Sequence, residues 1–551
     1  MSSLSNPAAK APAVTAHTAR PPNAIARSSV GASPSRRMLL VHLALAAIAI
    51  VPIALVELPG LGDYLNHLAR MHVMAEYDDS PHLRSLYLFT DVLRPYNGMK
   101  LVVPALAKVM SIYDAGRVFI AMAMLMPVLG AIVLHRVAWG TAGALPAVAF
   151  LFVYNGLLSW GFLNYLLASG LALLLLAAWL KARHWPRWWR ALFFAVAATL
   201  VYLCHVIAFG AYCCGVAGIE FARAWQAGRG QWRQIALNWA AAAAQAIPGA
   251  LLISQLEVGR FTVAPAITAF GDLAARQQAL ASPFSFLGGG ADLAGLAALL
   301  ALATWAVLRR RATLSATLWP AAAVLLGIAV LVPEWIDGTW GMHIRLPLLG
   351  VLILLAASNL RLSRREQGVL LAGVAALLVL KATAATIALR QVERDIVELR
   401  DLVQAIPEGE RVLVAIATLS EAKNRIGPWR MTAQSAMVAL IERDVFIPYL
   451  FSGVTVVQPL PDLLRLSTPH GHPISRSALA EGITARDGPG MPEGDGQGRR
   501  IYWRNWPANF GYVIWQHFGA AGLSHPHLLE QVAAGRSATI YRVRRLVGAS
   551  P

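Results

Sequence analysis

The sequence predicts a polytopic α-helical membrane protein that carries a small α/β domain at its C-terminus. Hydrophobic residues make up 57% of the 551 residues and charged residues only 14%, whereas a typical soluble domain has about 25% charged residues. The mean hydropathy is +0.54. Apolar runs of about 17–25 residues, the length needed to cross a bilayer, recur along the first 389 residues. This composition excludes a soluble globular protein.

The N-terminal 35 residues contain no such run, and we predict that they form a disordered cytoplasmic tail. They are rich in Ala, Ser and Pro and lack the compact charge, apolar core and small-residue cleavage site of a signal peptide. We therefore expect the first span, residues 38–57, to stay attached. It leads into a first outer loop at residues 58–116.

The remaining apolar runs predict further membrane helices. Residues 191–222 form a run that is too long for one ordinary span and short for two. His205-Val-Ile-Ala-Phe-Gly210 offers a polar break within this run, so we predict a tight hairpin of two helices. The chain then crosses the membrane about eleven times. The other predicted spans are residues 117–138, 142–159, 162–180, 234–255, 291–308, 315–333, 344–360 and 367–389.

Basic residues test this count, because cytoplasmic loops carry an excess of Lys and Arg. In the eleven-span arrangement the basic clusters fall on one side, which places the N-terminus in the cytoplasm and the C-terminal domain in the periplasm of a bacterial inner membrane. A single span at 191–222 would put Arg223, Arg229 and Arg233 on the opposite side and invert every later loop. The clusters are Arg36–Arg37, Arg136, Lys181–Arg190, Arg223–Arg233, Arg309–Arg311 and Arg361–Arg365.

The net charge of +18 reflects this topology and indicates contact with anionic membrane lipid. No DNA-binding or RNA-binding motif accompanies the basic residues, so nucleic acid is not an expected partner. All three cysteines, Cys204, Cys213 and Cys214, lie in the membrane part. We therefore expect no disulfide bond in the exported part.

From about residue 390 the composition changes to that of a soluble α/β domain, residues 390–551. A charged helical segment comes first, at 391–406. Further helices are expected at 433–443 and 526–533, and an irregular loop rich in Gly and Pro at 467–500. Strands are predicted where β-branched and aromatic residues are enriched, at 411–418, 454–460, 509–517 and 538–545.

The first outer loop carries an ionisable cluster directly after the first span. The stretch ELPGLGDYLNHLARMH, residues 57–72, predicts a helix from Asp63 onward. On that helix Asp63, His67 and Arg70 share one face, opposite an apolar side. This is the pattern of an amphipathic helix that lies in the membrane interface. The simpler interpretation is a solvated face on which Asp63 pairs with Arg70 or caps the helix.

Further polar and ionisable residues fall on the same, outer side of the predicted topology. Because such groups are costly at a membrane boundary unless they are paired or solvated, a convergent set indicates a functional site. Taken singly they have simpler explanations: Arg345 as a helix-end anchor at the interface, and His205 as a satisfied interior histidine. The set beyond the first loop is Asn155, Trp160, Asn164, His205, Asp272, Arg276, Asp337, Trp340, His343 and Arg345.

These features together resemble the GT-C class of integral-membrane glycosyltransferases, which use polyprenyl-phosphate sugars. Members carry an acidic catalytic residue in the first outer loop, matched here by Asp63 in PGLGDYLNHLAR, and many end in an outer soluble domain. Over nearly its whole length the chain also resembles a group of bacterial membrane proteins with a D-Y-x-N-H-L-A-R loop, a W-G-F-L-N-Y hairpin and a late R-L-P. The two-acid or D-x-D-like signature of many GT-C members is absent, and Glu57 is the candidate for a second acid.

The resemblance implies inverting transfer of a sugar from a polyprenyl-phosphate donor to a glycan, lipid or protein acceptor on the periplasmic face. Asp63 would be the general base, and His67 would orient it or join it as a metal ligand. Their spacing allows a divalent ion, but two ligands are too few to define one. Arg345 would clamp the donor's phosphate. The residues expected to bind substrate are Arg70, Asn155, Trp160, Asn164, His205, His343 and Arg345.

Two other classes of function stay open. A transporter or flippase of lipid-linked glycans would show ionisable residues near the bilayer midplane and paired half-repeats. The main intramembrane charge is Lys381, expected near the outer end of its helix, where it can reach the interface. A non-catalytic assembly partner in envelope polysaccharide biogenesis would dock through the outer domain. There Trp503, Trp506, Tyr512 and Trp515 form either a sugar-stacking platform or, as the alternation in YVIWQH favours, part of the core.

Overall fold

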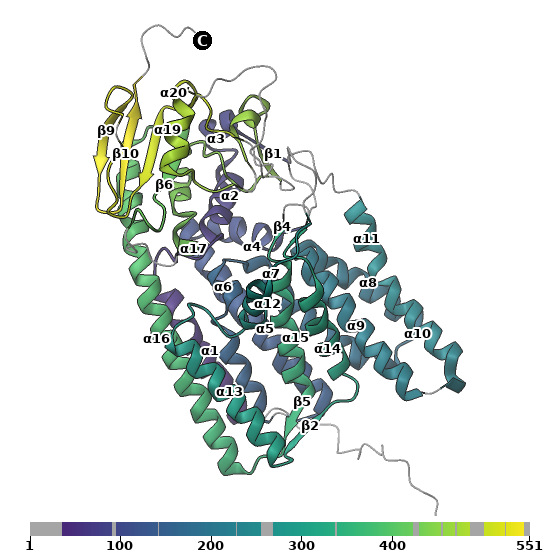
Figure 1. Cartoon of the computed structure of the whole chain (residues 1–551). Helices are drawn as coiled ribbons and strands as arrows, with labels where there is room; N and C mark the ends of the chain where they lie inside the picture. Colours follow the sequence, from purple (N-terminus) through teal and green to yellow (C-terminus); the bar gives the residue numbers. More distant parts are fainter. Residues whose placement is uncertain are drawn as a thin grey trace, which may run out of the picture.

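The protein, described from a computed structural model, is a bundle of helices that carries a small sheet domain at one end (Figure 1). Helix α16, Arg364–Leu402, runs along the side of the bundle and continues into the sheet domain. The predicted disordered tail lies outside the described residues. The structure describes residues 36–90, 95–141, 143–227, 229–254, 268–336, 339–422, 429–452, 456–468, 471–484, 501–523 and 525–544.

The apolar runs of the sequence form the bundle, which confirms a polytopic helical membrane protein. Among the described helices, eight are long and apolar enough to cross a membrane, and shorter apolar helices accompany them. The count of eleven crossings stays a prediction. The longer helices are α1 Arg36–Ala54, α5 Ile112–Trp139, α7 Leu163–Lys181, α8 Arg187–Cys204, α9 Val206–Ala227, α10 Trp232–Ala244 with α11 Ala246–Ser254, α13 Gly290–Leu308 and α16; the shorter ones include α14 Trp319–Leu331 and α15 Met342–Ala357.

The polar break expected at His205 is confirmed. Helix α8 ends at Cys204 and α9 begins at Val206, and His205 lies extended between them with φ −166° and ψ 120°. The Nδ1 atom of His205 accepts a hydrogen bond of 3.2 Å from the Ile207 N–H, one of the free donors at the start of α9. The run at 191–222 therefore forms two helices, which pack against each other.

The span predicted at 142–159 is not a continuous α-helix. Leu145–Phe152 form the 3-10 helix η1, and Gly156–Ser159 form the single turn α6. Pro146 cannot donate a backbone hydrogen bond, and the Asn155 side chain starts α6 by accepting two backbone hydrogen bonds. Both pieces are buried, so this segment lies inside the bundle.

The helix ends that carry the basic clusters lie together, away from the sheet domain (Figure 1). Strands β2, Ala312–Leu314, and β5, Ser358–Leu360, pair there and connect the end of α13 to the end of α15. Trp139, at the end of α5, donates from Nε1 to the Ala356 carbonyl at 3.1 Å. One end of the bundle is thus strongly basic, as the positive-inside rule requires of a cytoplasmic end.

Helix α16 has no break at residue 390, the predicted start of the soluble domain. Ser363 and Glu366 form a capping box at its beginning, and the 39 residues of the helix span about 58 Å at about 1.5 Å per residue. A bilayer's hydrocarbon core is only about 30 Å thick. The predicted charged segment at 391–406 therefore begins as the C-terminal part of α16 and continues into η4.

The C-terminal domain is built on a four-stranded sheet in the order β6-β8-β10-β9. Strands β6 and β8 are parallel, and the other neighbours are antiparallel. All four predicted strands are confirmed, but the one at 454–460 pairs with β1 of the first outer loop instead of joining this sheet. The strands are β6 Val412–Ile416, β8 Tyr512–Gln516, β10 Ala538–Val543, β9 Leu529–Ala534, β7 Val457–Pro459 and β1 Tyr87–Phe89.

Two predictions for this domain are wrong. The helix expected at 526–533 is largely strand β9, because pairing with β10 overrides the helix propensity of its Leu, Glu, Gln and Ala residues. The loop expected at 467–500 contains helix α19, Arg476–Thr484, and its residues 485–500 lie outside the described part.

The remaining elements are short. In the C-terminal domain they are η4 Val403–Ala405, α17 Trp429–Thr432, η6 Pro461–Leu466 and α20 Trp506–Asn509, together with η5 Ser435–Met437 and α18 Val438–Arg443 within the predicted 433–443 helix. Outside the domain they are α3 Pro81–Leu86, α12 Leu273–Ala281, η2 Ala182–His184, η3 Arg229–Gln231, β3 Trp335–Ile336 and β4 Thr339–Trp340.

The aromatic residues of the C-terminal domain belong mainly to its core. Trp506 and Trp515 are fully buried, Tyr512 is nearly so, and Trp503 is half-buried. The indole N–H of Trp506 donates to a backbone carbonyl at 2.8 Å, and that of Trp515 to another at 3.2 Å. These contacts support core packing over a sugar-stacking platform.

Lys381 is buried, contrary to the prediction that it reaches the interface. Its Nζ lies 3.1 Å from Asp292 Oδ1 and donates to the carbonyls of Leu151 and Phe284. The other carboxylate oxygen of Asp292 accepts hydrogen bonds from the backbone N–H groups of residues 286–288. The pair therefore fixes the start of α13 against α16 and leaves no isolated charge at this point.

Breaking this pair from either side should destabilise the protein, and removing both charges should cost less than the sum of the single changes. Lys381→Met leaves a buried carboxylate and Asp292→Asn a buried ammonium, each at a cost of about 3–5 kcal/mol. The asparagine keeps an oxygen for the backbone N–H groups. Thermal unfolding in detergent of both single variants and the double variant measures the coupling; additive losses would contradict it.

Candidate active site

The first outer loop folds into the junction between the bundle and the sheet domain. Its helix α2, Tyr64–Glu76, contacts α4, Gly98–Ala107, and α5 of the bundle and also α18 and η5 of the C-terminal domain. The predicted helix after Asp63 is thus confirmed. The predicted position flat on the membrane interface is wrong, because protein covers α2 from both parts of the chain.

Asn66 joins α2 to the C-terminal domain. Its Nδ2 donates to Gln434 Oε1 and to the Tyr449 carbonyl, both at 2.9 Å, and its Oδ1 accepts from the Phe451 N–H at 2.8 Å. Further along α2, His72 Nε2 lies 2.7 Å from an Asp444 carboxylate oxygen. The loop that carries Asp63 is therefore held by residues nearly 400 positions later in the chain.

Asp63 is held through its backbone, and its carboxylate stays free. The Gly62 and Asp63 N–H groups donate to the Ser159 and Trp160 carbonyls at 3.0 and 2.9 Å. Gly161 follows with φ +74°, and a Cβ at this position would lie 2.7 Å from the Asp63 nitrogen, so the contact requires glycine. The Asp63 carboxylate makes no capping hydrogen bond and has no partner among the described residues.

Burial raises the pKa of Asp63 to about 7, and the nearby positive charge of Arg345 acts in the opposite direction. The Asp63 side chain is half-buried. Desolvation disfavours the charged form of a carboxyl group. At neutral pH this group therefore populates both its protonated and its ionised forms, the state best suited to accept or release a proton.

His67 and Arg70 lie on the next turns of α2. The His67 ring packs 5.3 Å from the Phe451 ring, and burial together with the Arg70 charge lowers the pKa of His67 well below its usual value, so the ring is neutral at pH 7. Burial lowers the pKa of Arg70 to about 10, which leaves it charged. Within the described part of the chain, His67 Nδ1 and Arg70 Nε have no hydrogen-bond partner.

Arg345 reaches the same region from helix α15. Its guanidinium carbon lies 3.9 Å from the centre of the Phe162 ring, and its Nη1 donates to the Trp340 carbonyl at 2.6 Å. The buried Nε has no partner among the described residues. Asp63 and Arg345 act on each other electrostatically but form no direct ion pair. The carboxylate and the guanidinium are therefore near each other but more than 4 Å apart.

Aromatic rings line this region on two sides. The Trp340 ring lies 4.6 Å from that of Trp160 and 6.0 Å from that of His343. The ring of His205 lies 4.9 Å from that of Tyr96 and 5.2 Å from that of Tyr165. The structure thus brings the predicted residues Trp160, His205, His343 and Arg345 to the same region as Asp63, His67 and Arg70.

Three residues of this region carried no signal in the sequence. Phe162 stacks under Arg345, Tyr165 donates from its hydroxyl to the Arg345 carbonyl at 2.7 Å, and Tyr96 contacts His205 at a backbone φ of +71°. Aromatic residues in or beside an apolar run are indistinguishable from core residues by pattern alone. The W-G-F-L-N-Y motif contained two of them but did not single them out.

Two predicted substrate-binding residues have side chains engaged by the backbone. Asn155 caps α6 and donates to two carbonyls that precede it. Asn164 accepts from the Met99 N–H at 2.8 Å and donates to the Tyr96 carbonyl at 3.4 Å. We propose that both residues position the turns that carry Trp160 and Tyr96, in place of contact with a ligand.

The other outer-face candidates do not join Asp63. Glu57, considered as a second acid, pairs with Arg400 on α16 at 2.5 Å on an exposed surface. Asp272 caps α12, and Arg276 donates to a backbone carbonyl at 2.5 Å. Asp337 lies outside the described residues.

A metal ion at this site would require more than Asp63 and His67. Across the described residues, no group of three or more His, Cys, Asp or Glu side chains is placed to hold a metal ion. We therefore assign no metal ligands.

Comparisons with known proteins found a distant structural likeness. No protein-family profile matches the sequence, and no curated protein matches it significantly. The chain is similar to crystal structures of ArnT from Cupriavidus metallidurans bound to undecaprenyl phosphate (TM-score 0.44, 13% identity, 94% of this chain and 100% of that chain) and in the apo state (TM-score 0.45, 14% identity, 92% and 98%). The order of parts, a helix bundle followed by a small sheet domain, agrees with the arrangement predicted from the sequence.

Gly161→Ala should destabilise the protein more than Gly140→Ala. Both glycines have positive φ, +74° and +69°, so alanine costs each about 1–2 kcal/mol of backbone strain. A Cβ at 161 would also meet the Asp63 nitrogen at 2.7 Å, whereas a Cβ at 140 would meet nothing within 4 Å. Thermal unfolding of the two purified variants checks this. Equal melting temperatures would show that the backbone at Asp63 can shift to accept the added Cβ at no cost in stability.

Proposed function

We propose that this protein is a membrane glycosyltransferase that moves a sugar from a polyprenyl-phosphate donor to an acceptor hydroxyl. The observation that carries the proposal is the free, half-buried Asp63 carboxyl with a pKa near 7, close to the Arg345 guanidinium but not paired with it. A hydroxyl that displaces a phosphate needs a base for its proton and a cation for the leaving group. The proposed donor is of the ligand class found in the ArnT complex, undecaprenyl phosphate.

In the proposed reaction the Asp63 carboxylate takes the proton of the acceptor hydroxyl while that oxygen attacks the sugar C1. The new C1–O bond forms as the C1–O bond to the phosphate breaks, and its electron pair leaves with the polyprenyl phosphate. A single displacement of this kind inverts the configuration at C1. The proposed role of neutral His67, one turn along α2, is to orient the carboxylate.

Arg345 is the proposed clamp for the donor's phosphate. Its Nη1 is fixed by the Trp340 carbonyl and its plane by the Phe162 ring, while its Nε keeps a free N–H. A guanidinium held in this way offers directed donors to phosphate oxygens. Arg70, whose Nε is also free, supplies a second positive charge. Low local polarity strengthens both interactions.

The site is proposed to face the periplasm. It lies at the end of the bundle that carries the sheet domain, and the basic helix ends lie at the other end (Figure 1). Basic ends mark the cytoplasmic side of bacterial membrane proteins. The acceptor is then a glycan, lipid or protein of the cell envelope. Lys381 does not favour the transporter alternative, because it pairs with Asp292.

Asp63→Asn should abolish sugar transfer from an undecaprenyl-phosphate-linked donor, lowering kcat by about 10²–10⁴-fold. Asparagine is nearly isosteric but cannot act as a base. Because burial penalises the charged carboxylate, the variant should melt no lower than the wild type at pH 8. Transfer is measured in proteoliposomes. Unchanged turnover would remove Asp63 from the mechanism, and loss of folding would favour a purely structural role.

The pH profile provides the control for this variant. The pKa of Asp63 is raised from 3.8 to about 7, and a base acts only when deprotonated, so wild-type kcat/KM should fall below about pH 7 and level off above it. The raised pKa also means that the protonated form contributes stability that is fully present below pH 3.8 and is lost as pH rises from there through about 7. Asp63→Asn should remove this dependence of the melting temperature on pH.

Arg345→Lys tests the geometry of the phosphate clamp separately from its charge. Lysine keeps the positive charge and can reach the interface but lacks the planar fork and the stacking on Phe162. We expect a rise in donor KM or a fall in kcat of about tenfold or more, equivalent to one lost charge-assisted hydrogen bond. Wild-type donor kinetics in folded Arg345→Lys protein would exclude the clamp and favour the docking alternative.

A further inference from the structure

Helix α13 is attached to the bundle at its two ends. At its start Asp292 pairs with Lys381 of α16 at 3.1 Å. At its other end strand β2 pairs with β5, and Arg311 donates to the Arg361 carbonyl at 3.2 Å. Between these points only 17% of the helix is buried inside the protein. Most side chains in the middle of α13 are therefore not covered by neighbouring helices.

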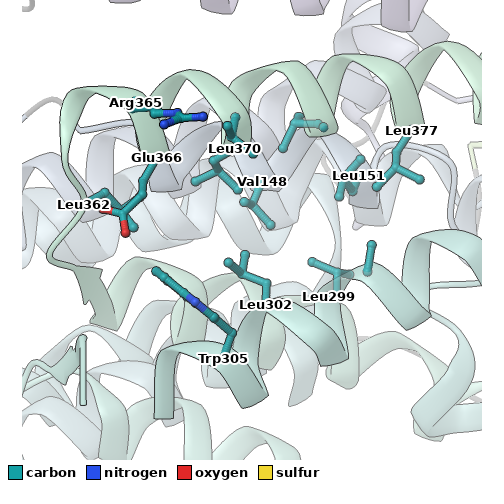
Figure 2. A pocket seen from close by; sticks show the side chains of 14 residues that line it. Val148, Leu151, Leu299, Leu302, Trp305, Leu362, Arg365, Glu366, Leu370 and Leu377 are labelled. Atoms are coloured by element: carbon teal, nitrogen blue, oxygen red, sulfur yellow. The ribbon is translucent and has the colours of Figure 1, made fainter. Parts of the chain in front are cut away.

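A groove lies between α13, η1 and α16. Its volume is about 470 Å³, within the range of about 300–1,000 Å³ typical of small-molecule sites. Figure 2 shows aliphatic side chains along its length, among them Val148, Leu302 and Leu370. Leu377 lies at one end, and Arg365 lies at the other. The groove is thus apolar along its length and charged at one end.

The charged end coincides with the basic end of the bundle. Arg365 is exposed there, and no described residue forms an ion pair or hydrogen bond with its guanidinium. Glu366, the acid beside it, is engaged in the capping box with Ser363. Arg309–Arg311 and Arg361 lie at the same end, next to the β2–β5 pair. Glu366 keeps its negative charge, but these five arginines outnumber it, so this end offers an excess of positive charge to an anion.

The dimensions of the groove match one membrane leaflet. From Arg365 to Leu377 the lining extends 12 positions along α16, or about 18 Å at about 1.5 Å per residue. Half of a hydrocarbon core of about 30 Å is about 15 Å. A hydrocarbon chain whose headgroup lies at Arg365 would therefore occupy the groove to its far end.

We propose that this groove binds one anionic phospholipid, with an acyl chain between α13 and α16 and its phosphate against Arg365. Basic pockets between membrane helices on the cytoplasmic side recognise anionic headgroups. The groove is partly open at the protein surface, so a lipid can enter it from the side. The site lies at the opposite end of the bundle from Asp63 and is independent of the proposed sugar transfer.

Gly373 allows the groove to be filled without disturbing the fold. It lines the groove, and a Cβ at this position would meet no atom within 4 Å. Leucine has a higher helix propensity than glycine by up to about 1 kcal/mol. Gly368, on the same helix but outside the lining, also has open space around its Cβ position. Gly368→Leu is therefore the matched control for Gly373→Leu.

Native mass spectrometry of the full-length protein in detergent, titrated with phosphatidylglycerol or phosphatidylcholine, tests the proposal. The wild type should bind one phosphatidylglycerol in preference to phosphatidylcholine. Gly373→Leu should weaken this binding by more than tenfold, and Gly368→Leu should leave it unchanged. Arg365→Ala should weaken it about fivefold, the effect of one basic residue at an anionic headgroup, and Arg364→Ala, which changes an arginine outside the lining, should have a smaller effect.

Three results would overturn the proposal. They are equal binding of the two lipids by the wild type, equal binding by Gly373→Leu and Gly368→Leu, and a retained molecule with the mass of a polyprenyl phosphate. Melting temperatures of all variants show whether each one is folded. Because no residue of the Asp63 region is changed, failure here leaves the proposed sugar transfer untouched, and inactive Asp63→Asn protein should still bind the lipid.

Discussion

Burial of helix α2 between the helix bundle and the C-terminal domain is the constraint on which the candidate site depends. A solvated helix in the membrane interface would leave Asp63 with an ordinary pKa and would let His67 and Arg70 point into water. Covered by α18 and η5, the same residues lose water, and their pKa values shift accordingly. The hydrogen bonds of Asn66 to Gln434, Tyr449 and Phe451 hold this cover in place. The C-terminal domain thus forms part of the site's environment.

Buried charges fall into two groups in this protein. Away from the site they are paired: Lys381 with Asp292, and Arg190 and Arg223 with the single carboxylate of Glu220, which also accepts from the Trp179 indole. Near Asp63, the Nε atoms of the charged Arg70 and Arg345 and the Nδ1 of the neutral His67 have no hydrogen-bond partner in the described part of the chain. Unpaired buried groups cost stability. Others lie elsewhere among the described residues, for example on His135 and at the Nε of Arg190. Those near Asp63 indicate a candidate site because a free carboxyl group lies beside them.

Helix α16 links the two parts of the chain mechanically. In the bundle it carries Lys381, which pairs with Asp292. Twelve residues further along the helix, Glu393 accepts a hydrogen bond of 3.3 Å from the Leu58 N–H, just before the Asp63 turn. Near its end Glu398 accepts from the N–H groups of Arg536 and Ser537 in the β9–β10 turn. A helix of 39 residues without an internal break is a stiff connection. It therefore holds the sheet domain and the first outer loop in fixed positions relative to each other.

The sequence by itself determined the membrane class, the positions of the long helices, the break at His205, the strands of the outer domain and the ionisable stretch after the first span. These features depend on local composition and periodicity, which a bilayer enforces because backbone polar groups must be satisfied within each segment. Only the tertiary structure decided that residues 526–533 are largely a strand, that Lys381 is paired, that Glu57 turns away to Arg400, and that Asn155 and Asn164 serve the backbone. It also placed Phe162, Tyr96 and Tyr165 beside Arg345 and His205. These outcomes depend on partners far away in the chain, and the identity of such partners is a property of packing that no local pattern contains.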